Sequence, residues 1–263
     1  MNTYTYDALE KNGRLGNQLW QIAWQLGSAS RDVGSRVSIK PDWEYRKYFS
    51  VPDEAFEPPV GNVIDGETLY YQELYHWDNI TDTVYDYFQP SDLSIEYLSN
   101  NYPDFFFDDN VNKTSIHIRA GDYLEHPTRF PVPTEKYYST AAQLVGETQF
   151  VVFSDNIDFA KNRLKGIDGD LMYVDGISRP INPLHRKGEP EDQWDMFLMS
   201  FCDQNIIGNS TFSWWGAFLA GHNQVFYPSV WFGPDLVAND SRGNDVRQSW
   251  KDGMPAEWSK VEC

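Results

Sequence analysis

The chain is poor in basic residues for its size. Its 263 residues include 21 Lys and Arg against 39 Asp and Glu, a formal net charge of −18 at pH 7. Nucleic acids and anionic membranes are bound through basic surfaces, so this acidic excess argues against both as partners. Cysteine is scarcer still, since Cys202 and Cys263 are the only two. They provide neither a disulfide framework nor the ligand spacing of a zinc site.

The sequence also lacks long apolar runs and the glycine fingerprint of dinucleotide-binding folds. No apolar run reaches the length that spans a bilayer, so we expect no membrane span. Gly13 and Gly16 enclose a short turn and do not form Gly-x-Gly-x-x-Gly, which argues against a dinucleotide-dependent redox enzyme. Hydrophobic residues still make up 41% of the chain, enough to build the core of one large domain or two modest ones.

Two charged side chains follow segments that have the pattern of buried strands. Residues 115–118 alternate apolar and polar side chains and lead to Arg119, just before a break at Gly121. Residues 150–153 are almost continuously apolar and lead to Asp155, after which a helical pattern begins. Strands separated by helices predict a parallel sheet, whose ligands bind beyond the carboxyl ends of the strands.

A third apolar run ends at Gly208, and small capping residues follow it at 209–211. We expect a helix to start near Phe212 or Ser213, with its free N–H groups and positive dipole end attracting an anion. Each feature has a simpler alternative: a surface salt bridge for Arg119, a helix N-cap for Asp155 and an ordinary capped helix here. The coincidence of three strand ends at one edge favours a nucleotide-diphosphate site.

Four sequence blocks resemble those of a known family. They lie at residues 13–18 with 21–23 behind them, at 117–122, at 153–155, and at 198–200 continuing through 205–216. In this order they resemble the α-1,2-fucosyltransferases of bacteria and animals, glycosyltransferase family 11. Short signatures are shared with protein O-fucosyltransferases and α-1,6-fucosyltransferases. The last block, Asn-Ile-Ile-Gly-Asn-Ser-Thr-Phe-Ser-Trp-Trp-Gly, is long enough to be highly specific.

The resemblance implies an α/β fold of the GT-B type, in which two Rossmann-like lobes with parallel sheets face a cleft. It implies an inverting glycosyltransferase that moves a sugar, usually L-fucose from GDP-L-fucose, to a carbohydrate acceptor, here by α-1,2 linkage to a galactoside. No metal and no cofactor are implied, since the GDP-sugar is a substrate. Animal members carry a Golgi anchor that this chain lacks, so we expect a cytoplasmic enzyme of a bacterium, or of a virus that infects one.

The family's site residues carry over by motif. The catalytic pair would be Arg119, which grips the departing diphosphate, and Asn17, which faces the sugar and acceptor from the first lobe. The donor-binding residues would be His117, Arg119, Asp155, Ser210, Thr211, Phe212 and Ser213. Among them, Asp155 would pair with the guanine edge, while residues 211–213 would hold phosphate oxygens. Gly13, Gly16 and Asp122 would support the site, Asp122 by fixing the Arg119 loop.

These residue types suit the implied chemistry on physical grounds. Breaking a glycosyl–phosphate bond builds negative charge on the diphosphate, and preorganised donors aimed at its oxygens lower that barrier. A planar guanidinium fits phosphate better than an ammonium does. Many relatives carry a second arginine where this chain has Ala120, which leaves a second cationic contact in doubt. A general base is not identified among the many acidic residues, although Asp7, Asp53 and Glu54 are candidates.

We expect an acceptor-side lobe over residues 1–110, a nucleotide-sugar-binding lobe over 111–240, and a tail over 241–263 that packs on the first lobe. Within them the patterns predict a strand at 3–9, a helix from 18 to about 33 and a short strand at 171–174. The polar loop at 181–187 is either a plain surface connection or a flap over the site. The oligomeric state is not predicted.

Two functions from other classes stay open. One is a carbohydrate-binding pseudo-enzyme that keeps the fold without turnover, which Ala120 favours and the intact Arg119 and Asn17 disfavour. The other is a glycoside hydrolase with a carboxylate pair, suggested by the abundant acids and aromatics. Release of free GDP with and without acceptor separates the first alternative from a transferase, and the second predicts no nucleotide affinity.

Overall fold

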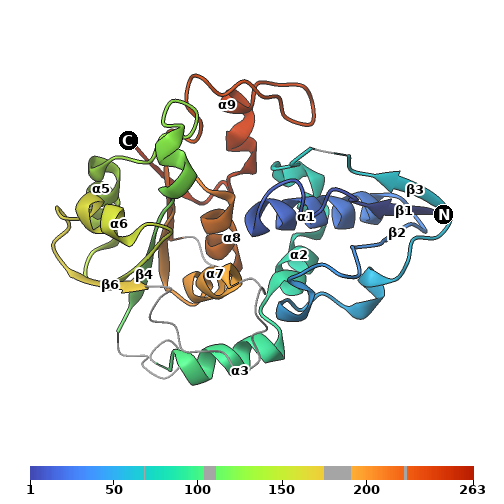
Figure 1. Cartoon of the computed structure of the whole chain (residues 1–263), viewed down its shortest axis with the longest axis horizontal. Helices are drawn as coiled ribbons and strands as arrows, with labels where there is room; N and C mark the ends of the chain where they lie inside the picture. The colour runs from blue at the N-terminus through green and yellow to red at the C-terminus, as the bar shows by residue number, and fades with distance from the viewer. Residues whose placement is uncertain (68, 104–110, 175–190, 222–223) are drawn as a thin grey trace. The chain divides into compact units, whose positions relative to one another are not determined.

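The computed structural model describes the chain apart from residues 68, 104–110, 175–190 and 222–223 (Figure 1). The chain divides into two compact units. Unit 1 comprises Met1–Glu96, Gly188–Gln193 and Ala238–Pro255, and unit 2 comprises Tyr97–Lys187, Trp194–Val237 and Ala256–Cys263. The lobe boundary expected near residue 110, and the loop at 181–187, lie outside the described residues.

Unit 1 is built on a parallel sheet with the strand order β2-β1-β3. Its strands and helices are β1 (Asn2–Thr5), α1 (Leu15–Arg31), β2 (Arg36–Val37), β3 (Asn62–Asp65), α2 (Thr81–Phe88) and α9 (Val246–Ser249). Short 3-10 helices are η1 (Arg46–Tyr48), η2 (Asp53–Phe56), η3 (Leu74–His76), η4 (Asp78–Ile80) and η7 (Trp250–Gly253). A further helix, α3 (Asp92–Asn101), runs from unit 1 into unit 2.

Helix α1 confirms the helix predicted there, with a start three residues earlier than expected. Its apolar residues Leu19, Ile22, Ala23 and Leu26 recur at the helical period and are all buried. The predicted opening strand is shorter than expected, since β1 ends at Thr5. Strand β3 was not predicted, because most of its side chains are exposed and it shows no apolar alternation.

Unit 2 is built on a six-stranded parallel sheet in the order β6-β5-β4-β7-β8-β9. The strands are β4 (Lys113–Ile118), β5 (Gln149–Ser154), β6 (Asp170–Val174), β7 (Gln204–Ile206), β8 (Val225–Pro228) and β9 (Ser259–Val261). The helices are η5 (Gly121–Glu125), α5 (Glu135–Val145), α6 (Ile157–Arg163) and α8 (Thr211–Leu219), together with α7 (Asp192–Ser200), which belongs to unit 2 from Trp194 onward. The strands predicted at 115–118, 150–153 and 171–174 are therefore confirmed.

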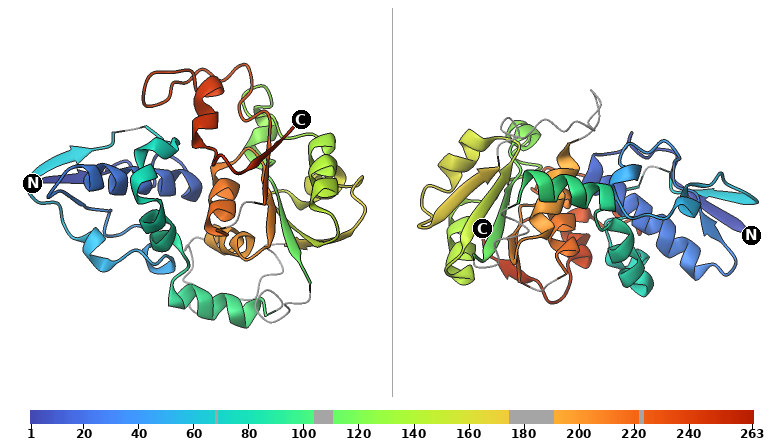
Figure 2. Two further views of the ribbon diagram at one scale, coloured as in Figure 1. Left: turned by 180° about the vertical axis from the view of Figure 1, so that it is seen from behind. Right: turned by 90° about the horizontal axis from the view of Figure 1, so that it is seen from below.

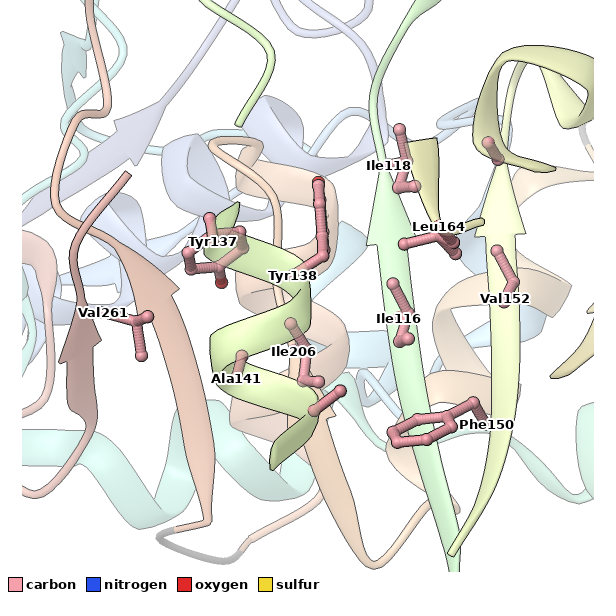
Figure 3. Close-up of a cluster of buried hydrophobic side chains, with 12 residues drawn as sticks. Ile116, Ile118, Tyr137, Tyr138, Ala141, Phe150, Val152, Leu164, Ile206 and Val261 are labelled. Carbon is pink, nitrogen blue, oxygen red and sulfur yellow. The ribbon is translucent and has the colours of Figure 1, made fainter. Parts of the chain in front are cut away.

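Helices cover both faces of this sheet, which explains its strongly apolar strands. Figures 1 and 2 show α5 and α6 on one side of β4, with α7 and α8 on the other. The α5 and α6 side is filled by a core that includes Ile116, Val152 and Ile206 from three strands (Figure 3). On the opposite face the ring centroids of His117 and Phe212 lie 5.6 Å apart, which packs β4 against α8.

The last part of the chain is divided between the units. Residues 238–255 belong to unit 1, where the Ser241 main-chain N–H donates to the Glu73 carboxylate over 3.3 Å. Residues 256–263 belong to unit 2, where β9 pairs in parallel with β8 at the sheet edge. No helix among the described residues is long and apolar enough to cross a membrane.

Candidate functional site

The predicted donor-side residues of unit 2 follow the carboxyl ends of three neighbouring strands. In register, Ile118 of β4 pairs with Ser154 of β5, so these two strands end level with each other. Strand β7 lies on the other side of β4 and leads into the turn before α8. Arg119, Asp155 and the start of α8 therefore follow the same edge of the sheet, as the strand patterns predicted.

Arg119 is held by two carboxylates. Its Nη1 lies 2.6 Å from Oδ2 of Asp155, and its Nη2 donates to Oδ1 of Asp122. The guanidinium carbon also lies 5.7 Å from the ring centroid of Tyr123. Because its side chain is only 15% exposed, Arg119 is a largely enclosed and oriented cation and not one half of a loose surface pair.

Asp155 organises the loop that carries Arg119. Its Oδ1 accepts the main-chain N–H groups of Ala120 at 2.8 Å and Gly121 at 3.2 Å. A Cβ atom at Gly121 would lie 2.5 Å from Oδ2 of Asp155, so the carboxylate can approach this closely only because residue 121 is glycine. The N-cap of α6 is Asn156, which excludes the alternative in which Asp155 caps that helix.

Ser210 lies in the polar turn between β7 and α8 and is the N-cap of α8. Helix α8 begins at Thr211, slightly earlier than expected, and the Ser210 hydroxyl accepts the N–H of Phe212 at 3.3 Å. The Ser213 hydroxyl is fully buried and lies 3.2 Å from the carbonyl oxygen of Gly208, to which it can donate. Side chains at 210 and 213 thus stabilise the turn, while Thr211 and Phe212 are half-buried.

His117 is buried beneath this edge. Burial lowers the pKa of His117 to about 4, with the nearby charge of Asp155 raising it and that of Arg119 lowering it further. The imidazole is therefore neutral at physiological pH. Its Nδ1 has no hydrogen-bond partner within the part of the chain that the structure describes.

Tyr123 contacts two of the candidate site's segments, and the motifs did not identify it. Its hydroxyl donates to the main-chain oxygen of Asn209 over 3.0 Å, while its ring lies beside Arg119. The Asn209 amide in turn donates to the carbonyl oxygens of Pro131 and Trp231 at 2.9 and 2.8 Å. Tyr123 therefore ties the Arg119 loop to the turn before α8. Its position directly after Gly121-Asp122 was the one available signal.

In unit 1, the turn at residues 13–16 positions Asn17. Gly13 has a φ of +107°, the unusual backbone angle that its glycine predicted. Gly16 is buried in the first turn of α1. The Asn17 side-chain oxygen accepts a hydrogen bond from Nε2 of Gln72 at 3.0 Å, a contact that the sequence did not suggest.

No group of three or more His, Cys, Asp or Glu side chains suited to a metal is found among the described residues. An Asp-x-Asp pair is present at Asp168 and Asp170. Asp170 is the first residue of β6 and so lies at the amino ends of the parallel strands, whereas Arg119 follows their carboxyl ends. The base candidates Asp7, Asp53 and Glu54 are all exposed, and Asp53 pairs with Arg46 at 2.8 Å.

Comparisons with known proteins identify the family of the chain. The family model of glycosyl transferase family 11 matches residues 22–232, which is most of the chain. The O-antigen biosynthesis glycosyltransferase WbnK of Escherichia coli is 35% identical over 54% of this chain and 45% of its own length. An α-1,2-colitosyltransferase of Escherichia coli is 32% identical over 58% and 48%. Galactoside α-(1,2)-fucosyltransferase 1 of Aotus azarae is 28% identical over 42% and 30%.

Solved structures show the same fold. The NodZ α-1,6-fucosyltransferase soaked with GDP-fucose aligns with a TM-score of 0.50 at 13% identity, covering 83% of this chain and 92% of that one. A variant of FUT1 from Arabidopsis thaliana in complex with GDP gives 0.50 at 13% identity, covering 84% and 68%. The α/β, GT-B-like fold class predicted from the sequence is confirmed.

The chain belongs to glycosyl transferase family 11. It spans about half the length of the bacterial relatives that it matches, at 45% and 48%.

Proposed function

We propose that the chain is an inverting glycosyltransferase that moves a sugar from a GDP-sugar to a hydroxyl of a carbohydrate acceptor. The main support for this proposal is the largely enclosed Arg119, which Asp155 orients at the carboxyl ends of the unit 2 strands. The membership of the chain in family 11 is consistent with it. In this role Arg119 binds the donor diphosphate and stabilises the charge that develops as it leaves.

The start of α8 is the proposed second contact for the diphosphate. The first N–H groups of a helix have no partners within that helix, and they carry the positive end of its dipole. Thr211 contributes through its main-chain N–H and its hydroxyl. The N–H of Phe212 already donates to the Ser210 hydroxyl, so a bound diphosphate shares or replaces that acceptor. Because the Ser210 and Ser213 hydroxyls are engaged in the turn, their proposed contribution comes through the main chain. The proposed role of His117 is to pack beneath the nucleotide as an uncharged imidazole.

Asn17 is the proposed catalytic residue of unit 1, in contact with the transferred sugar or the acceptor hydroxyl. For the linkage we propose α-1,2, because the names of the colitosyl and fucosyl relatives share it. The names of these two relatives differ in the sugar that is transferred, colitose in one and fucose in the other. L-fucose on a galactoside is our proposed pair, and a cytoplasmic location stays a prediction.

A turnover assay tests this function. We expect GDP-L-fucose to be consumed with release of GDP only when a galactoside acceptor is present, and with activity retained in excess chelator. Nucleotide binding without turnover would instead indicate the pseudo-enzyme alternative. Loss of turnover with chelator, restored by manganese, would contradict metal independence.

Thermal stabilisation tests the nucleotide. A ligand that binds the native state raises its stability with the logarithm of its concentration over its dissociation constant. We expect GDP to raise Tm well above the effect of ADP, UDP or CDP, because the guanine N1 and N2 donors can pair with a carboxylate such as Asp155. Equal shifts with all four nucleotides would contradict this assignment of Asp155.

A further inference from the structure

The two elements proposed to hold the diphosphate, the Arg119 loop and the start of α8, are joined by the side chain of Tyr123. Its hydroxyl donates to the main-chain oxygen of Asn209 over 3.0 Å, and Asn209 immediately precedes Ser210, the N-cap of α8. Its ring centroid lies 5.7 Å from the guanidinium carbon of Arg119. Because a carbonyl oxygen can only accept, the tyrosine is the donor in this hydrogen bond.

The far end of this connection is fixed by the side chain of Asn209. Asn209 is 1% exposed, and its Nδ2 donates to the carbonyl oxygens of Pro131 and Trp231 at 2.9 and 2.8 Å. Both partners are acceptors, so turning this amide over would set an oxygen against two oxygens and lose both hydrogen bonds. The carbonyl group that Tyr123 binds therefore belongs to a residue that is held in place from behind.

The ring of Tyr123 is held as well. It stacks on Phe130 with ring centroids 5.0 Å apart and an angle of 21° between the planes, and Phe130 meets Phe232 edge-on at 6.3 Å. The main-chain N–H of Gly233 donates to the carbonyl oxygen of Arg129 over 2.8 Å, which ties these two aromatic segments together. A tyrosine has only two side-chain torsions, so a stacked ring and a bonded hydroxyl fix its conformation.

This contact lies beyond the end of the ladder between β4 and β7. The register of these two strands ends at the pair Ile116 and Ile206, and Arg119 and Asn209 each lie three residues further along their segments. Main-chain pairing between the two strands thus stops before the residues that matter for a ligand. The hydroxyl of Tyr123 adds a side-chain connection between the two segments at that point.

We propose that Tyr123 is a positioning residue for the transfer reaction, which keeps the Arg119 guanidinium and the start of α8 at the separation that one diphosphate requires. The proposal rests on the function proposed above. Both elements act on the same leaving group, whose negative charge grows as its bond to the sugar breaks, so their spacing matters most in the transition state. Misplacing such a group by about 1 Å can cost on the order of a hundredfold in rate.

A double-mutant cycle tests this role. Tyr123→Phe removes the hydroxyl and keeps the ring that stacks on Phe130 and lies beside Arg119. We expect kcat to fall by about tenfold, with a smaller change in KM for the donor. In an Arg119→Lys background the same change should lower kcat by no more than about twofold, because Tyr123 acts through Arg119. An equal loss in both backgrounds, or a normal kcat in Tyr123→Phe, would overturn the proposal.

Tyr137→Phe is the matched control. The hydroxyl of Tyr137 also donates to a main-chain oxygen, that of Ile207 at 2.6 Å, but the residue lies on α5 in the core of unit 2 (Figure 3). We expect Tyr137→Phe to lower Tm at least as much as Tyr123→Phe, because the lost hydrogen bond is fully buried, and to retain kcat. A loss of kcat equal to that of Tyr123→Phe would show a general effect of stability and overturn the positioning role.

The outcomes separate this proposal from the function on which it rests. A wild-type protein that turns over no GDP-sugar would overturn the proposed function itself. Normal turnover of the wild type together with an equally active Arg119→Lys variant would overturn the role of Arg119, and with it that of Tyr123. Normal wild-type turnover, an impaired Arg119→Lys variant and a fully active Tyr123→Phe variant would overturn the role of Tyr123 alone.

Discussion

The two carboxylates that hold Arg119 are not equivalent. Asp155 is anchored by the N–H groups of residues 120 and 121, whereas Asp122 is 55% exposed and contacts Arg119 from the surface. A bound diphosphate needs the guanidinium edge that one of them now occupies. Asp122 is the one that can yield it, since less is lost when an exposed ion pair opens.

Neutralising each carboxylate should therefore change a different quantity: GDP affinity for Asp122 and turnover for Asp155. We expect Asp122→Asn to bind GDP several-fold more tightly, because a competing negative charge is removed, with the largest gain at low salt. We expect Asp155→Asn to lower kcat strongly, because the Arg119 loop loses its anchor. Calorimetric titration with GDP and steady-state kinetics measure the two effects. Weaker GDP binding in Asp122→Asn would contradict its role as a competitor.

Replacing Arg119 by lysine tests the guanidinium itself. Lysine keeps the positive charge but loses the planar fork that contacts both carboxylates and that suits the geometry of a diphosphate. If Arg119 stabilises the departing diphosphate, the loss falls on kcat more than on donor binding, and we expect at least about a hundredfold. Tm should change little. A well-folded Arg119→Lys protein with near-normal kcat would place the site elsewhere.

At the level of elements, we expect the cap of α8 to couple helix stability to donor binding. Ser210→Ala removes the hydroxyl that accepts from the Phe212 N–H and should cost about 1 kcal/mol of unfolding free energy. It should also weaken GDP binding, because residues 211 and 212 then lose their fixed geometry. Urea denaturation and GDP titration measure the two effects.

The N-cap of α5 offers the matched control. Thr134 accepts from the Tyr137 N–H at 3.3 Å, the same kind of cap on a helix outside the proposed site. Thr134→Ala should lose a similar amount of stability and keep its affinity for GDP. A parallel loss of GDP affinity in both variants would show that the effect of Ser210→Ala is one of general stability.

For the whole molecule, His117 makes stability depend on pH. Its folded-state pKa of about 4 lies below the ordinary value of 6.5, so the unfolded chain takes up this proton first. The stability that neutral His117 contributes is complete above pH 6.5 and is lost as the pH falls toward 4. The shift corresponds to on the order of 3 kcal/mol.

Urea denaturation of wild type and His117→Gln at several pH values isolates this contribution. We expect the wild type's stability advantage over the variant to shrink by roughly 2 to 3 kcal/mol between about pH 7.5 and 4.5. His126 is exposed, and His126→Gln should follow the wild-type curve in parallel. A constant difference between wild type and His117→Gln would mean that His117 titrates normally in the folded protein.

The sequence by itself determined the features whose signals are local. The apolar period of α1, the strand patterns of β4, β5 and β6 and the order of the motifs predicted the fold class and the sheet edge that carries Arg119 and Asp155. These predictions hold because strand and helix periods are set by neighbouring residues. The exposed strand β3 and the edge strand β9 have no such pattern, and they were missed.

Only the tertiary structure decided which side chains act on each other. Asp155 anchors the loop of residues 119–121, and Tyr123 joins that loop to the turn before α8. Gln72 reaches Asn17 from 55 positions away, and Ser241 reaches Glu73 from 168 positions away. Contacts of this kind depend on how distant segments pack, and a single chain carries no periodic trace of them. The motifs therefore supplied the candidate site residues, whereas the groups that hold those residues in place were found only in the tertiary structure.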